Sequence, residues 1–404
     1  MRRLAWVLML AFSFAIPWEY SLDLGAPLGN IARIAGLLVV VVLIPAVLQA
    51  GRIRTPGPVH WLALALYLWF CCSYFWSIEP AATLERMRAY AQVMMVVLFA
   101  WELTETEDDL RDLMRAYVAG SLVLAVLTFA SFMSPAAAGQ IRFAAEGQDP
   151  NDAARFLDLG FPLAALLLAV ERRWWIKWLA LAYFPLGILG VLLSASRGGL
   201  VAATFAFAGC GLLLVRTRPR IVWGGLLAMP VLAGLFWWAI PRATLTRIAS
   251  IGEQFSGGDL NQRLNIWMAG NRAFAHAPLF GSGAGTFVAA ARLAQIDTAH
   301  NTVLSVAVEG GLIAVTLALA VVVATARSVL RTQGAVRGAL GTALLVWMIT
   351  SLVATVEGNR STWFLIGLIA VAARLTEQSP APNTLAFDVR ISPAMRGSMA
   401  ENKA

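Results

Sequence analysis

The segment RLNIWMAGNRAFAHAPLFGSGAGTF, residues 263–287, belongs to the one long polar interval in a chain otherwise made of apolar runs. This interval extends from about residue 241 to residue 300, where AHN precedes the next apolar run. Binding and catalytic residues are found disproportionately on connecting segments held by a rigid scaffold. We therefore expect the chemistry of the chain to lie in residues 241–300.

The composition sets the environment in which every other residue must be judged. The chain has 404 residues, of which 59% are hydrophobic and 13% are charged, and its mean hydropathy is +0.71. A soluble globular domain carries about 25% charged residues. Lipid offers the backbone no hydrogen-bond partners, and the apolar runs lack the alternation of barrel strands. The sequence thus predicts an all-α, polytopic membrane protein.

About twelve membrane spans are expected, each of roughly 20 residues. They lie near residues 4–17, 31–50, 60–77, 88–102, 115–133, 156–170, 178–195, 199–215, 221–240, 301–325, 339–356 and 362–375. The polar interval then separates the ninth and tenth spans. Residues 1–377 form the predicted membrane domain, and residues 378–404 lack periodicity and are expected to be a disordered cytoplasmic tail.

The distribution of basic residues predicts the orientation. Lys and Arg in short connections favour cytoplasmic termini at both ends, with the 241–300 loop on the outer side. That side then holds a dozen arginines and no lysine, because Lys177 and Lys403 both lie inside. A general preference for arginine explains the missing lysines, but it does not explain so much outer positive charge. Arginine grips phosphate bidentately, so this side is suited to an anionic ligand.

Other functional classes are disfavoured. The net charge of +8 is spread over many loops and does not form a basic face, so nucleic-acid binding is not expected. The three cysteines lie inside apolar runs and are interpreted as packing residues. No histidine pair or carboxylate pair stands at ligand spacing, so neither a metal site nor a cofactor is expected.

Four arginines stand out by position. Arg197 lies in LLSASRGGL, between two apolar runs, and its two following glycines permit close backbone approach. Arg263 begins the segment quoted above, and Arg86 and Arg88 lie in SIEPAATLERMRAY. The alternative for each is that the side chain extends to lipid headgroups. Arg272, in the long loop, is a further candidate contact.

His300 is the candidate general base, because an imidazole titrates near the working pH and can accept a proton from a hydroxyl. The alternative is a capping or core histidine. Glu309 lies nine residues later, which places it on the opposite face of a helix, so the two are not expected to act together. Asp149 and Asn151 could hold a sugar hydroxyl, but capping the next helix is favoured.

Taken together, these motifs resemble the O-antigen ligase family. They are LSASRGG, Arg263 with Trp267 followed by Pro278, Gly281 and Gly283, His300–Asn301 followed by the pair Gly310–Gly311, and DPN-x-A from residue 149. The resemblance covers roughly residues 60–375. It extends to the wider superfamily of O-antigen ligases, O-antigen polymerases and bacterial O-linked oligosaccharyltransferases.

The resemblance implies a GT-C-like transferase of the Gram-negative inner membrane. Its donor would be a glycan linked to undecaprenyl diphosphate, and its acceptor a sugar hydroxyl of the lipid A core. Arg197, Arg263 and His300 match the family's essential positions, and Arg86 and Arg88 would contact the diphosphate. The expected reaction is an inverting, metal-independent transfer at the periplasmic face.

Two alternatives accompany this hypothesis. Within the superfamily, the chain could be an O-antigen polymerase or an O-linked oligosaccharyltransferase. In a different class, a transporter or flippase for anionic lipid-linked glycans would also place arginines in a cavity, although no clear internal repeat is present.

Overall fold

The computed structural model describes the chain except residues 26–28, 136–137, 251–262, 295–296 and 379–404. The described part contains fifteen α-helices, two short 3-10 helices and one isolated β-bridge between Asp23 and Asn30. The prediction of an all-α polytopic membrane protein is confirmed. The predicted tail lies outside the described residues from residue 379 onward.

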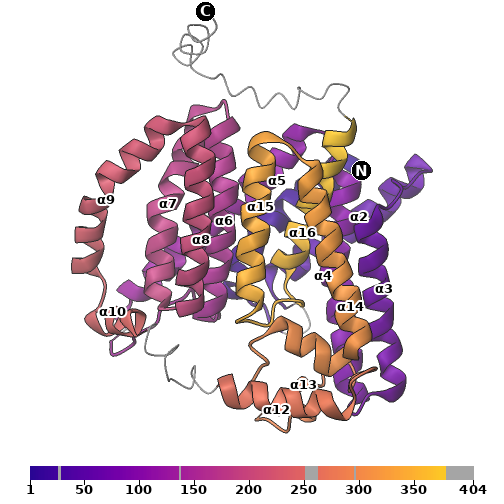
Figure 1. Cartoon of the computed structure of the whole chain (residues 1–404). Coiled ribbons are helices and arrows are strands. Elements are labelled where there is room, and N and C mark those ends of the chain that lie inside the picture. The colour runs from indigo at the N-terminus through magenta and orange to yellow at the C-terminus, as the bar shows by residue number, and fades with distance from the viewer. Residues whose placement is uncertain (26–28, 136–137, 251–262, 295–296, 379–404) are drawn as a thin grey trace, which may run out of the picture.

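The long helices of the described part, twelve in number, form a bundle, as Figure 1 shows. They are α1 (Arg2–Ala15), α2 (Ile31–Ala50), α3 (Pro58–Cys72), α4 (Pro80–Leu103), α5 (Glu107–Met133), α6 (Pro150–Val170), α7 (Trp174–Ser194), α8 (Arg197–Thr217), α9 (Pro219–Ala239), α14 (Thr302–Arg331), α15 (Gly334–Ser351) and α16 (Arg360–Gln378). Each overlaps one of the expected spans, although some of those spans extend past the helix, as 60–77 does beyond Cys72 and 339–356 beyond Ser351. The first residue of α1 and the last of α16 lie at the same end of the bundle (Figure 1).

Ten helical segments in the described part are long and apolar enough to cross a membrane, two fewer than the expected twelve. The two expected spans that fall short are α4 and α16, which carry charged residues such as Arg86, Glu102 and Arg374. In α16 every residue from Ser361 to Leu375 is buried by other helices. A helix covered by protein does not need the apolar surface that lipid demands, which accounts for its lower hydropathy.

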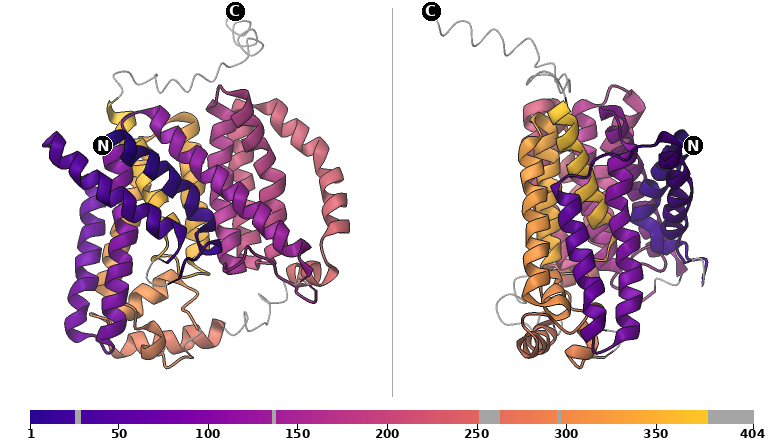
Figure 2. Two further views of the ribbon diagram at one scale, coloured as in Figure 1. Left: turned by 180° about the vertical axis from the view of Figure 1, so that it is seen from behind. Right: turned by 90° about the vertical axis from the view of Figure 1, so that its right-hand side faces the viewer.

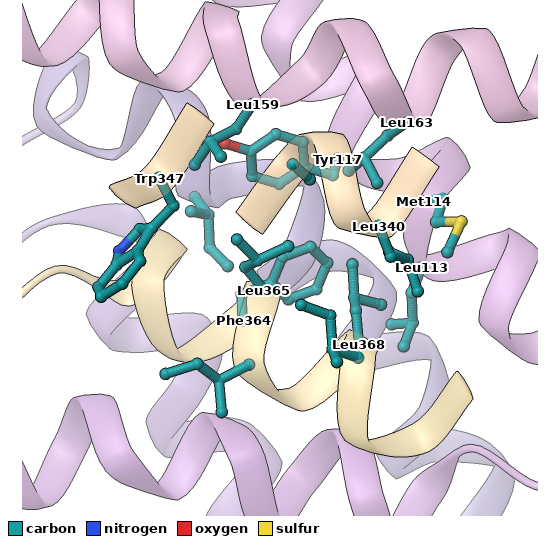
Figure 3. Close-up of a cluster of buried hydrophobic side chains, with 14 of the residues drawn as sticks. Leu113, Met114, Tyr117, Leu159, Leu163, Leu340, Trp347, Phe364, Leu365 and Leu368 are labelled. Atoms are coloured by element: carbon teal, nitrogen blue, oxygen red, sulfur yellow. The ribbon is translucent and has the colours of Figure 1, made fainter. Parts of the chain in front are cut away.

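The centre of the bundle is a cluster contributed by α5, α6, α15 and α16 (Figure 3). Tyr117 of α5 stacks on Phe364 of α16, with ring centroids 5.3 Å apart. The Tyr117 hydroxyl donates a hydrogen bond to the carbonyl of Phe156 at 3.2 Å, which satisfies its polar end. These central helices fix the positions from which the connecting segments at either end project.

Three short helices lie across the end of the bundle opposite the N-terminus (Figures 1 and 2). They are α10 (Arg242–Ala249), α12 (Arg263–His276) and α13 (Phe287–Ala290). All three come from the 241–300 interval, so the long polar loop is largely helical where it is described. We call this end of the bundle the loop end. The two 3-10 helices are η1 (Ile16–Ser21) and η2 (Ser73–Trp76).

Candidate functional site

The turn between α7 and α8 is the backbone segment to which the other parts of the site bind. Ala195 adopts a left-handed conformation with φ of 48°, and the Ser196 hydroxyl accepts a hydrogen bond from the Gly199 N–H at 3.2 Å, capping α8. Arg197 is the first residue of α8. A Cβ at Gly199 would overlap Ala154 of α6, so the glycine after Arg197 allows two helices to approach closely, as the sequence predicted.

Helix α10 folds back onto this turn. Arg197 donates from Nε to the carbonyl of Arg247 at 3.2 Å and from Nη2 to the Ser250 hydroxyl at 2.7 Å. In return, Arg247 donates from Nε to the carbonyl of Ala195 at 3.4 Å. Arg197 therefore holds the backbone of Arg247, and Arg247 holds the backbone of Ala195, two residues before Arg197. The hydrogen bonds among the described residues leave further N–H groups of both side chains for a ligand.

A third arginine, Arg142, binds the same turn from the connection between α5 and α6. It donates from Nε to the carbonyl of Ser194 at 3.2 Å and from Nη2 to the side-chain oxygen of Asn151 at 2.8 Å. The Ser196 hydroxyl donates to that same oxygen at 3.0 Å. Asn151, one of the candidate sugar contacts, thus links Arg142 to the α7–α8 turn.

The other half of the site comes from α12 and the start of α14. Arg263 is the first residue of α12, and Trp267, one turn later, donates from Nε1 to the carbonyl of Ala299 at 3.1 Å. His300 follows in a left-handed conformation with φ of 45°. The Asn301 side chain then accepts from the Leu304 N–H at 2.9 Å and caps α14. The RxxxW and HN motifs therefore meet in space, since Trp267 of one holds the turn that presents His300 of the other.

Electrostatic interactions connect these two halves. Arg142, Arg197, Arg247 and Arg263, which we call the arginine cluster, act on one another through their charges, and Asp149 is the carboxylate that acts on Arg142 and Arg263. None of the four forms a salt bridge within the described part of the chain. Four guanidinium groups and one carboxylate leave an excess of positive charge at this place, which is suited to an anionic ligand.

The arginines remain cationic in this setting. Partial burial lowers the pKa of Arg142, Arg247 and Arg263, and Arg197 lowers each of these pKa values further. Because the ordinary pKa of arginine lies far above neutral pH, these three guanidinium groups stay protonated there. An anion that enters the cluster relieves this mutual repulsion.

Two of these charged residues, Arg263 and Asp149, also act on His300. Its half-buried position lowers its pKa below the ordinary value of 6.5, and the charge of Arg263 lowers the pKa further, while Asp149 opposes the shift. The neutral imidazole therefore predominates at neutral pH and is able to accept a proton. The capping role that was the alternative reading of His300 is performed by its neighbour, Asn301.

The other candidate residues differ in position and role. Asp149 is exposed and caps α6 by accepting from the Asn151 N–H at 2.7 Å, as favoured from the sequence. Arg272 is exposed on α12. Arg88 is exposed on α4, whereas Arg86, two residues earlier, faces inward and interacts with Glu309 and Glu357. The structure thus brings Arg197, Arg263 and His300 together but places Arg86 among carboxylates.

Two members of the cluster, Arg142 and Arg247, were not singled out from the sequence. Both were counted among the outer arginines, but neither belongs to a motif. Their role depends on α10 and the α5–α6 connection packing against the same turn, a tertiary arrangement with no periodic signal. The part of the chain that the structure describes contains no group of three or more His, Cys, Asp and Glu side chains placed to hold a metal ion.

The part of the chain that contains the α7–α8 turn, α12 and the start of α14 matches a known protein family. Residues 180–319 match the O-antigen ligase family model. This stretch is similar to O-antigen ligases. It contains Arg197, Arg263 and His300 and thus confirms the resemblance, whereas Arg86, Arg88, Asp149 and Asn151 lie outside it.

The chain was also compared with curated proteins and with solved structures. No curated protein matches the chain. Among solved structures, the chain is similar to one from a structure described as "Structural coordination of polymerization and crosslinking by a peptidoglycan synthase complex". The two share 15% sequence identity with a TM-score of 0.44, and the alignment covers 80% of this chain and 98% of the other.

Proposed function

We propose that this protein is an O-antigen ligase. It transfers a glycan from undecaprenyl diphosphate to a sugar hydroxyl of the lipid A core, in a GT-C-like fold of twelve spans at the periplasmic face of a Gram-negative inner membrane. One observation carries the proposal. Arg197, Arg263 and His300 all lie in the stretch that matches the O-antigen ligase family, and in the structure the charge of Arg197 acts on Arg263 and the charge of Arg263 acts on His300. With the arginine cluster on the outer side, both termini face the cytoplasm.

The arginine cluster binds the diphosphate. When the bond between the sugar C1 and the phosphate oxygen breaks, its electron pair stays on that oxygen, and the leaving undecaprenyl diphosphate gains negative charge. Positively charged donors aimed at this developing charge stabilise the transition state more than the ground state. Arg197 and Arg263 are the principal ligands, and we add Arg142 and Arg247. A phosphate near Arg86 would have to compete with Glu309 and Glu357 for its guanidinium.

His300 acts as the general base. The acceptor hydroxyl attacks C1 from the side opposite the diphosphate, its proton passes to the imidazole of His300, and the configuration at C1 inverts. A positioned general base typically contributes about 10²–10⁴-fold to the rate. The charge of Arg263 acts on His300, so the two residues are near enough to serve one bound donor, with the diphosphate at Arg263 and the acceptor hydroxyl at His300.

The direct test is transfer by the purified protein in proteoliposomes. The donor is an undecaprenyl-diphosphate-linked glycan, the acceptor is lipid A core, and His300→Ala is the inactive control. Glycan attached to the core supports the ligase. Glycan lengthened on the undecaprenyl carrier would instead identify a polymerase, and movement of the donor across the bilayer without any transfer would identify a transporter.

A further inference from the structure

The chain between α15 and α16, residues 352–359, contacts both halves of the site. We call it the α15–α16 connection. It lies outside residues 180–319, the stretch that matches the O-antigen ligase family. On one side it binds the two residues that follow His300, and on the other it packs against the residue that follows Arg197.

Asn301 and Thr302, which follow the candidate base, are both hydrogen-bonded to this connection. The Asn301 side chain donates from Nδ2 to the carbonyl of Leu352 at 3.2 Å, while its oxygen caps α14. The Thr302 hydroxyl donates to the carbonyl of Ala354 at 2.8 Å and accepts from the Val356 N–H at 2.9 Å. Thr302 is buried, so these two bonds satisfy backbone groups that water does not reach.

The backbone of His300 depends on such support, because it is left-handed with φ of 45°. Residues other than glycine are uncommon in this region, and they keep such a conformation only where the surrounding structure imposes it. Trp267 holds one side of the turn through the carbonyl of Ala299, and Thr302 holds the other side. The position of the imidazole therefore depends on α12 and on the α15–α16 connection together.

The connection is itself fixed to the central helices α15 and α16. Trp347 of α15 donates from Nε1 to the Thr362 hydroxyl at 2.9 Å, and that hydroxyl donates to the carbonyl of Val356 at 2.7 Å. Val356 is fully buried. Because Thr362 binds its carbonyl and Thr302 binds its N–H, hydrogen bonds lead without interruption from the core of the bundle to the start of α14.

The same connection packs against the turn between α7 and α8. A Cβ at Gly198, the residue after Arg197, would lie 2.9 Å from Cγ2 of Val353. Val353 therefore fills the space that a side chain at residue 198 would need. Its branched side chain has few χ1 conformations and cannot easily turn aside. The absence of a side chain at Gly198 is thus what allows the connection to lie against the start of α8.

We propose that the α15–α16 connection is a positioning element that fixes His300 relative to Arg197, with Thr302 and Val353 as its positioning residues. The inference rests on the proposed function, in which Arg197 binds the diphosphate and His300 accepts the proton of the acceptor hydroxyl. Both groups must then reach one donor–acceptor pair at the same time, and a misplacement of about 1 Å costs about 10²-fold in rate. Thr302 and Val353 act on the reaction through their neighbours.

Removing the Thr302 hydroxyl tests the His300 side of the connection. Thr302→Val keeps the branched shape and removes both hydrogen bonds, whereas Thr302→Ser keeps the hydroxyl. We expect Thr302→Val to lower kcat about 10- to 100-fold with the KM of the donor unchanged, and Thr302→Ser to restore most of the activity. Thr316→Val is the matched control, because the exposed Thr316 hydroxyl donates to Leu312 of its own helix. Equal kcat values for Thr302→Val and Thr316→Val would overturn the inference.

A compensating pair of substitutions tests the Arg197 side. Gly198→Ala pushes Val353 aside and should raise the KM of the donor about tenfold, because overpacking displaces the adjoining guanidinium. Val353→Ala removes Cγ2 and makes room for the new methyl group, so the double variant should recover a KM near that of the unmodified protein. A double variant as impaired as Gly198→Ala alone would show that Val353 does not position this turn.

Hydrogen–deuterium exchange of the full-length protein in detergent measures the coupling between the two sides without any substrate. In Thr302→Val we expect faster exchange at residues 352–356 and also at residues 196–200, whereas Thr316→Val should change neither. Faster exchange at residues 352–356 alone would refute the positioning role, even if the unmodified protein transfers glycan to lipid A core. If the unmodified protein transfers none while both stretches exchange faster, the proposed function fails and the coupling stands.

Discussion

The backbone N–H of Gly285 donates a hydrogen bond to Glu309 Oε2 at 2.8 Å. This bond joins the glycine-rich loop, residues 281–285, to Glu309 within α14. Backbone bonds reinforce this junction, since Ser282 donates to Val308 and Gly283 donates to Glu309, both at 2.9 Å. Gly283 has φ of 109°, and a Cβ there would overlap Ser77. Glu309 therefore acts on the loop and not on His300, consistent with the expectation that these two residues lie on opposite faces.

Replacing Glu309 should destabilise the protein. Glu309→Ala leaves the partly buried N–H of Gly285 without its acceptor, a loss of about 1–3 kcal/mol, and removes one of the two carboxylates that act on Arg86. Glu309→Gln keeps an acceptor oxygen and should lose less. Thermal unfolding in detergent measures both, and Glu85→Ala on the exposed side of α4 is the matched control. Equal unfolding midpoints for Glu309→Ala and Glu85→Ala would show that the bond contributes nothing.

Loss of the base should slow the chemical step. His300→Ala is expected to lower kcat by about 10²–10⁴-fold with little change in the KM of the donor, because the imidazole acts on the acceptor hydroxyl. His276→Ala is the control, since His276 is exposed at the end of α12 and belongs to no cluster. A larger effect on the KM than on kcat would mean that His300 binds substrate without accepting a proton.

The pH dependence should carry the signature of His300. Burial and Arg263 lower its pKa below 6.5, so the base is neutral at pH 7 and activity should fall on acidification only below that value. Removing the positive charge in Arg263→Gln should raise the pKa of His300 and move the acid limb of the profile to higher pH. A pH–rate profile of each variant measures this. An acid limb that stays at the same pH in Arg263→Gln would show that Arg263 does not affect the pKa of His300.

Arg142 and Arg247 should each contribute to donor binding. A hydrogen bond to a charged group is worth about 1.5–3 kcal/mol, so Arg142→Ala or Arg247→Ala should raise the KM of the donor about 10- to 150-fold. Lysine should restore only part of this, because it keeps the charge but cannot hold the turn carbonyl and a phosphate at once. Arg272→Ala, which alters an exposed arginine of α12, should bind the donor normally. An equal effect of all three alanine variants would point to bulk charge alone.

The comparison between sequence and structure shows which features are encoded locally. Apolar runs located the long helices, and DPN correctly favoured Asp149 as a cap, because both signals lie within a few residues of their effect. Arg197, Arg263 and His300 were found through motifs of a known family. The contributions of Arg142 and Arg247 depend on contacts across about 50 residues or more, such as Arg247 with Ala195, which no periodicity reports.

Helix α9 shows the limit of hydropathy in the same way. Its sequence is apolar on all sides, like those of its neighbours, so composition identifies a span but not whether protein or lipid surrounds it.

The surroundings of Arg86 were also not predictable from the local sequence. Both Arg86 and Arg88 were expected to contact the diphosphate, but Arg86 lies near Glu309 of α14 and Glu357 of the α15–α16 connection, two carboxylates that are distant in the sequence.

A cryo-electron microscopy structure with bound undecaprenyl diphosphate tests the central claim most directly. The account predicts phosphate oxygens within hydrogen-bonding distance of Arg197 and Arg263, with Arg142 or Arg247 completing the contact and the His300 imidazole beside the bound diphosphate. A diphosphate held at Arg86 and Arg88, or at any place from which His300 could not reach the acceptor hydroxyl, would contradict it.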